Sequence, residues 1–215
     1  MTVFSFFNNR NKNLLCALSG AFPRECQADV KHVIDRTVMP RSVAYNGLLY
    51  SDLFREVRLL SGESIRIPER IYINDRIFHE CLLTPKQRII YHCIFSRSND
   101  GYIREKHVKA LLNEEVPEWA MPFVIKLSEE YVREILEVIY DRLSNTDCGK
   151  YKELCALNFE ITESAHSRMI SYWNEYYRYS RYGNRYSCEY KDYVGNKLFR
   201  ECFGYFKSGQ KFIRM

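Results

Sequence analysis

The chain has 215 residues and a net charge of +5, with 46% hydrophobic and 27% charged residues. Such usage is ordinary for a globular protein and excludes a wholly disordered chain or a miniature scaffold. Nine glycines and six prolines are too few for a β-sandwich or for Gly-rich nucleotide loops, so the composition favours helices. No apolar run approaches the roughly 20 residues of a membrane span, and we therefore expect no membrane partner.

Charge is distributed unevenly along the chain. Residues 164–215 contain ten Lys or Arg against four acids, a net charge of +6, and nine of the 17 tyrosines. Basic residues between aromatic ones can bind polyanions, because cations neutralise phosphates and rings stack on bases. The alternative is a solvated helix face whose tyrosines cover a core.

The cysteines favour a reducing compartment. There are eight, with no CxxC motif, which excludes the usual zinc ribbons and fingers. Several lie in apolar stretches, where a reduced thiol behaves as a small hydrophobe, and this predicts a cytoplasmic protein. The alternative is a secretory signal, since Arg10 and Lys12 precede an apolar run over residues 14–22.

The first part of the chain divides into two predicted segments. Residues 1–60 form an N-terminal helical block, with apolar spacing near 3.6 over 26–38 and 51–60. Residues 61–82 form an extended strap or short hairpin, because isoleucines alternate with polar residues over 64–74, namely Ile65, Ile67, Ile71 and Ile73. Pro68 lacks a backbone donor, which places this segment at a sheet edge or across helices.

Residues 83–215 form the third predicted segment and read as consecutive amphipathic helices. Thr84 and Pro85 provide an N-cap and first residue for a helix ending at Phe95. Asp100 caps a second helix over 102–112, Pro117 begins a third that ends at Leu127, and a fourth runs over 130–143. Helices of this length with short connections predict stacked antiparallel hairpins.

An internal repeat supports this architecture. The sequence from Asp100 to Glu105 matches that from Glu129 to Glu134, with an acid, a tyrosine, a β-branched residue, an arginine and a glutamate in register. Weaker matches place Arg168 and Arg200 at further offsets of similar length. Offsets near 30 residues are typical of one helical hairpin per repeat.

Residues 84–144 resemble HEAT-like (armadillo-type) helical repeats. In that family a proline bends the first helix of each hairpin, an acidic turn follows, and a Val-Arg pair opens the second helix. Pro122, Glu129 or Glu130, Val132 and Arg133 occupy these places. The resemblance implies a short mostly α solenoid with the small extended segment near 64–74. It also implies a structural ladder of turn acids and arginines from neighbouring hairpins, here Asp100, Arg104, Glu130 and Arg133.

The sequence lacks the usual catalytic motifs, and we expect no cofactor. Nothing matches a nucleotide loop, HExxH, GxSxG or an EF-hand. The most metal-like group is His79, Cys81, His92 and Cys93, with Asp75 nearby, but its spacing lacks the reach of ordinary zinc clips. We therefore predict neither a metal site nor catalytic residues, and a metal-dependent enzyme is the second alternative.

The stretch from Trp173 to Tyr186 is the candidate binding surface. Tyrosine and arginine are the residue types that anchor interfaces, and the candidates are Trp173, Tyr176, Tyr177, Arg178, Arg181 and Arg185. The sequence thus predicts a non-catalytic scaffold whose partner is another protein. The first alternative is binding of nucleic acid through the basic C-terminal part, because some HEAT-like proteins cradle duplexes and a few excise damaged bases.

Overall fold

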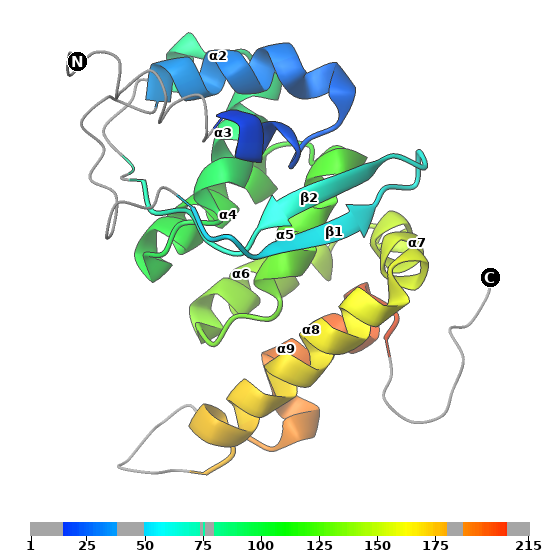
Figure 1. Cartoon of the computed structure of the whole chain (residues 1–215). Helices are drawn as coiled ribbons and strands as arrows, with labels where there is room; N and C mark the ends of the chain where they lie inside the picture. Colours follow the sequence, from blue (N-terminus) through cyan, green and yellow to red (C-terminus); the bar gives the residue numbers. More distant parts are fainter. Residues whose placement is uncertain (1–14, 38–49, 74, 76–79, 180–186, 206–215) are drawn as a thin grey trace. The chain divides into compact units, whose positions relative to one another are not determined.

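The computed structural model describes residues 15–37, 50–73, 75, 80–179 and 187–205 (Figure 1). The chain divides into two compact units, Met1–Phe123 and Val124–Met215, and each is described by itself below. The boundaries predicted at 60/61 and 82/83 both fall inside the first unit.

The first unit begins with helical structure. A 3-10 turn, η1 (Arg24–Cys26), leads directly into α2 (Gln27–Thr37), as predicted for 26–38. Val30, Val33 and Ile34 are fully buried and lie on one face of α2, at the spacing from which the helix was predicted.

A two-stranded antiparallel hairpin follows. Strand β1 (Phe54–Arg58) pairs with β2 (Ser64–Pro68), with Phe54 opposite Pro68 and Arg58 opposite Ser64 (Figure 1). The helix predicted over 51–60 is therefore wrong. Val57 and Leu59 are buried two positions apart, which is the period of a strand, and Gly62 at φ 91° allows the tight turn that returns the chain.

The extended segment after this turn is confirmed. Its four isoleucines are each at most 2% exposed, so the alternation with polar residues correctly identified one buried face. Pro68 ends β2, and Ile71 makes isolated bridges to Tyr50 and Ser98. The hairpin is thus continued by an extended strap.

Helices α3 (Pro85–Phe95) and α4 (Gly101–Asn113) pack against each other, and a 3-10 turn, η2 (Glu80–Leu82), precedes them. Thr84 and Gln87 form a capping box at the start of α3. The side chain of Asp100 accepts a hydrogen bond from the backbone of Tyr102 at 2.8 Å. Both predicted caps are therefore confirmed.

The third predicted helix differs in its first turn. Pro117 precedes a 3-10 turn, η3 (Glu118–Ala120), and the α-helix α5 spans Met121–Leu127. Pro122 lies at the second position of α5, where its missing N–H costs no helical hydrogen bond. Pro122 thus lies one residue after the junction of η3 and α5.

The second unit consists of short helices. Its α-helices are α6 (Arg133–Leu143), α7 (Gly149–Leu157), α8 (Phe159–Tyr172) and α9 (Val194–Lys197). A 3-10 turn, η6 (Tyr190–Asp192), precedes α9, and two π-helical turns, η4 (Trp173–Tyr177) and η7 (Leu198–Cys202), extend α8 and α9. The buried residues Ile135, Leu136, Ile139 and Leu143 give α6 the predicted apolar face, which packs against α9 and η7.

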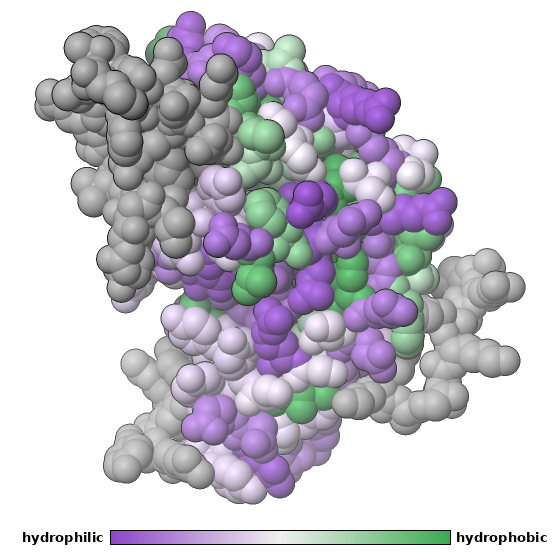
Figure 2. Space-filling model, in the orientation of Figure 1, coloured by the Kyte–Doolittle hydropathy of each residue, from purple (hydrophilic) through white to green (hydrophobic). Residues whose placement is uncertain are grey.

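The prediction of a mostly helical chain with a small extended segment is confirmed. Within the described ranges, no helix is both long and apolar enough to cross a lipid bilayer. On the face drawn in Figure 2, hydrophobic residues are scattered in small patches among polar ones.

Candidate functional site

Five tyrosines in the second unit form a continuous aromatic group, which we call the tyrosine cluster: Tyr131, Tyr172, Tyr176, Tyr177 and Tyr193. Tyr176 lies near both Tyr131 and Tyr172, with ring centroids 6.1 and 6.2 Å away. Tyr131 and Tyr176 are 48% and 50% exposed, whereas Tyr193 is fully buried. The cluster therefore has one side in the core and one side in solvent.

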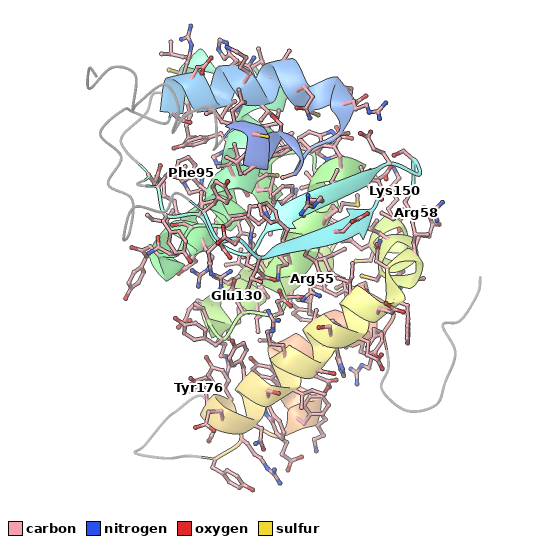
Figure 3. The ribbon with its side chains drawn as sticks, in the orientation of Figure 1. Arg55, Arg58, Phe95, Glu130, Lys150 and Tyr176 are labelled. Atoms are coloured by element: carbon pink, nitrogen blue, oxygen red, sulfur yellow. The ribbon has the colours of Figure 1, made fainter. Side chains whose placement is uncertain are left out.

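Consecutive tyrosines have different environments in this cluster. The Tyr177 ring stacks on that of Tyr193 at 5.4 Å, and its hydroxyl donates to the backbone carbonyl of Tyr131 at 2.7 Å. Burial raises the pKa of Tyr177. Tyr176 projects from the end of α8 (Figure 3). Tyr177 is thus a packing residue, and Tyr176 is the exposed one.

The other predicted binding residues are also divided. Trp173 Nε1 donates to the carbonyl of Cys188 at 3.1 Å, and the indole meets the Tyr190 ring, so Trp173 holds the segment before α9. Arg178 is exposed and lies over the exposed ring of Tyr179 at 4.9 Å. Arg181 and Arg185 lie outside the described residues.

A π-helical turn sets this arrangement. The backbone N–H of Arg178 donates to the carbonyl of Trp173 at 2.9 Å, five residues back. Such turns are rare in proteins, and those that occur are often at functional sites. The sequence carried no signal for this turn, which determines the directions of Tyr176 and Tyr177.

The predicted ladder residues lie at helix starts. Arg104 donates to the carbonyls of Ser98 and Asn99, and Arg133 pairs with Glu137 at 2.7 Å one turn along α6. Glu130 is 2% exposed, just before α6 (Figure 3). These contacts are local, and the ladder between hairpins stays a prediction.

The first unit contains a buried polar chain that the sequence analysis missed. His92 Nδ1 on α3 and His107 Nδ1 on α4 lie 3.0 Å apart. His107 Nε2 is 3.1 Å from Asp75 Oδ2. The Asp75 carboxylate also accepts from Tyr91 and Lys106, each at 2.6 Å. The only sign of this contact in the sequence was that each helix of one predicted hairpin carries a histidine.

Burial and these contacts shift the pKa values of two members of this polar chain, Asp75 and His92. Burial raises the pKa of Asp75, but the contacts with His107, Lys106 and Tyr91 outweigh it and hold the pKa well below its usual range. Burial and the neighbouring His107 lower the pKa of His92 to about 4. The polar chain thus runs from an ionised Asp75 through His107 to a neutral His92.

The predicted metal-like group does not assemble among the described residues. Cys81 is exposed and Cys93 is fully buried, while His79 lies outside the described ranges. Across the described part of the chain, no three His, Cys, Asp or Glu residues are arranged to hold a metal ion.

The polar chain could take part in a reaction only if a substrate could reach its side chains from solvent. The side chains of His92, His107 and Asp75 are 3%, 0% and 6% exposed. A pocket of about 270 Å³ in the same unit is lined by other residues: Cys16, Ala17, Gly20, Tyr50, Phe54 and Arg66. Because these three side chains are buried, we infer that they contribute to packing. The exposed tyrosines of the second unit are therefore the stronger candidate for a functional site.

Comparisons with protein-family models, curated proteins and solved structures give no match for this chain.

Proposed function

We propose that the protein is a non-catalytic, protein-binding helical protein whose contact surface is the exposed side of the tyrosine cluster. The observation that carries the proposal is the exposure of Tyr131 and Tyr176, which are 48% and 50% exposed although their rings contact each other and that of Tyr172. Tyr179, beside the cluster, is 55% exposed and lies under the Arg178 guanidinium. Tyrosine contributes a large, stiff contact area at low entropic cost, which makes it a frequent interface anchor.

The charges beside the cluster favour a protein over a nucleic acid as partner. Nucleic-acid binding needs a basic stripe that neutralises phosphates. Apart from the buried Glu129 and Glu130, the charged residues from 129 to 137 and from 168 to 178 have mixed signs, with three acids and three arginines: Glu134, Glu137, Glu175, Arg133, Arg168 and Arg178. A mixed-sign aromatic surface is typical of protein recognition.

Two broader expectations are part of the proposal. A HEAT-like arrangement is supported by the packing of α3 on α4 and by the matching turn acids and arginines before α4 and α6. A cytoplasmic location is supported by the eight cysteines, each of which is a free thiol.

The test compares two matched tyrosine variants of the full chain. Wild type and each variant are immobilised and exposed to native extract with and without nuclease treatment, and captured proteins are identified by mass spectrometry. Tyr176→Ser removes a ring of the cluster, and Tyr102→Ser removes an 85% exposed tyrosine on α4. We expect a partner captured by wild type and by Tyr102→Ser to lose about 30-fold in affinity for Tyr176→Ser, which corresponds to about 2 kcal/mol.

Equal capture by both variants would refute the proposed surface. Loss of all capture after nuclease treatment would support nucleic acid as the ligand. Circular dichroism of Tyr176→Ser provides the folding control, because an exposed residue should be replaceable without loss of helix.

A further inference from the structure

The pocket of about 270 Å³ in the first unit is built from three segments of the chain. They are residues 16–20, the start of β1 with the residues before it, and the middle of β2, and together they provide the lining residues Cys16, Ala17, Gly20, Tyr50, Phe54 and Arg66. The backbone N–H of Arg66 donates to the carbonyl of Gly20 at 2.6 Å. This bond ties β2 to the segment that forms the opposite wall, so the pocket belongs to the fold of this unit.

Two aromatic rings and one cation determine the chemistry of the pocket. The rings of Tyr50 and Phe54 meet edge to face, with centroids 6.0 Å apart. The guanidinium of Arg66 lies over the Phe54 ring, 5.1 Å from its centroid. The N–H donors of a guanidinium lie in its own plane, so contact of its face with a ring leaves them able to bind a planar anion.

The charge of the pocket favours an anion. Of the described residues that line it, Arg66 alone is charged. Glu56 lies opposite Arg66 in the hairpin register, but none of the ion pairs among the described residues includes Arg66. A concave site lined by one sign of charge attracts ligands of the opposite sign.

We propose that this pocket binds a small aromatic carboxylate, with the carboxylate on the Arg66 guanidinium and the ring against Tyr50 and Phe54. Arginine binds a carboxylate through two parallel hydrogen bonds, and aromatic rings pack on one another at their edges and faces. The volume of the pocket lies below the roughly 300 to 1,000 Å³ of sites for drug-sized ligands, so the ligand should have a single ring. The proposal concerns the first unit and does not depend on the tyrosine cluster.

The test titrates the purified full chain with three probes and follows the backbone amide signals by NMR. Benzoate carries both the ring and the charge, benzamide is its neutral counterpart of the same shape, and cyclohexanecarboxylate keeps the charge without the flat ring. We expect benzoate to shift the amide signals of Gly20 and Arg66. The affinity should be about 10-fold lower for benzamide, which lacks the charge-assisted hydrogen bonds, and about 3-fold lower for cyclohexanecarboxylate, which lacks the aromatic contact.

Arg66→Gln tests the cation, and Arg58→Gln is its matched control. Both arginines are exposed and lie on the same face of the hairpin, but Arg58 does not line the pocket. We expect Arg66→Gln to bind benzoate about 10-fold more weakly than wild type and Arg58→Gln to bind it equally well. Glu56→Gln removes the acid opposite Arg66 and should strengthen binding about 2-fold.

Four results would overturn the proposal. They are equal affinities for benzoate and benzamide, an unchanged affinity in Arg66→Gln, shifts confined to amides outside the pocket, and no shift at millimolar benzoate. The comparison of probes on wild type does not depend on the variants, so it decides the question even if Arg66→Gln fails to fold.

Discussion

The hydroxyl of Tyr177 donates a hydrogen bond to the backbone carbonyl of Tyr131, 2.7 Å away, and so ties the π-helical turn after α8 to the chain entering α6. The ring behind that hydroxyl stacks on the fully buried Tyr193. One side chain thus fixes the positions of two segments that carry exposed tyrosines.

Removing this hydroxyl should destabilise the fold. We expect Tyr177→Phe to lower the free energy of unfolding by about 1 kcal/mol, because the ring stays and one hydrogen bond is lost. Tyr102→Phe is the control and should leave stability unchanged, since its side chain is 85% exposed. Urea denaturation measures both, and equal midpoints would contradict the role given to Tyr177.

The buried histidine predicts acid sensitivity. The pKa of His92 falls from about 6.5 in the unfolded chain to about 4 in the folded protein, so the unfolded state binds the proton first. The stability from neutral His92 is complete above pH 6.5 and is lost as the pH falls toward 4, in total about 3 kcal/mol.

Denaturation at a series of pH values checks this expectation. His92→Asn should flatten the fall in stability between pH 6.5 and 4, whereas His32→Gln on α2 should keep it. A wild-type stability that is constant over this range would contradict the neutral state of His92.

A glycine in α9 predicts intolerance to any side chain. A Cβ at Gly195 would lie 2.7 Å from Tyr193 Cε1 and 2.8 Å from Met169 Cγ, both in fully buried side chains. Gly195→Ala should therefore lower the free energy of unfolding by about 1 to 3 kcal/mol. In Gly20→Ala the nearest atom is 3.7 Å away, so that variant should stay near wild type; a similar loss in both would argue against overpacking.

The capping box of α3 predicts a further effect on stability. Thr84→Ala removes the acceptor for the backbone N–H of Gln87 and should cost about 1 kcal/mol of unfolding free energy. Thr84→Ser retains the hydroxyl and should restore most of it. Thermal unfolding followed by circular dichroism distinguishes the two, and identical curves would show that the cap contributes little.

Local signals in the sequence predicted the local structure well. Thr84 with Pro85, and Asp100, identified two helix starts because caps depend on a few neighbouring residues. The isoleucines after Ser64 identified a strand because alternation reflects one buried face. The segment around Val57 was misread, since a five-residue strand that depends on pairing with β2 is too short to show a clear period.

The candidate site was predicted only in outline. The sequence located the aromatic stretch around Trp173, but neighbours in the sequence gave no means to separate the exposed Tyr176 from the packed Tyr177. That difference depends on Tyr131 and Tyr193, which are distant in the chain. The contact between His92 and His107 likewise requires two helices to pack, which spacing alone does not determine.

The π-helical turn from Trp173 to Tyr177 has a consequence for insertions and deletions. A π turn holds one residue more than an α-helical turn, so a one-residue deletion within it would restore an ordinary helix. Each residue beyond the deletion would then turn by about 100° and shift by about 1.5 Å along the axis. Tyr177 would move off Tyr193 and away from the Tyr131 carbonyl. The length of this segment is therefore more constrained than its composition: many side chains can be exchanged at the exposed positions, but the number of residues cannot change.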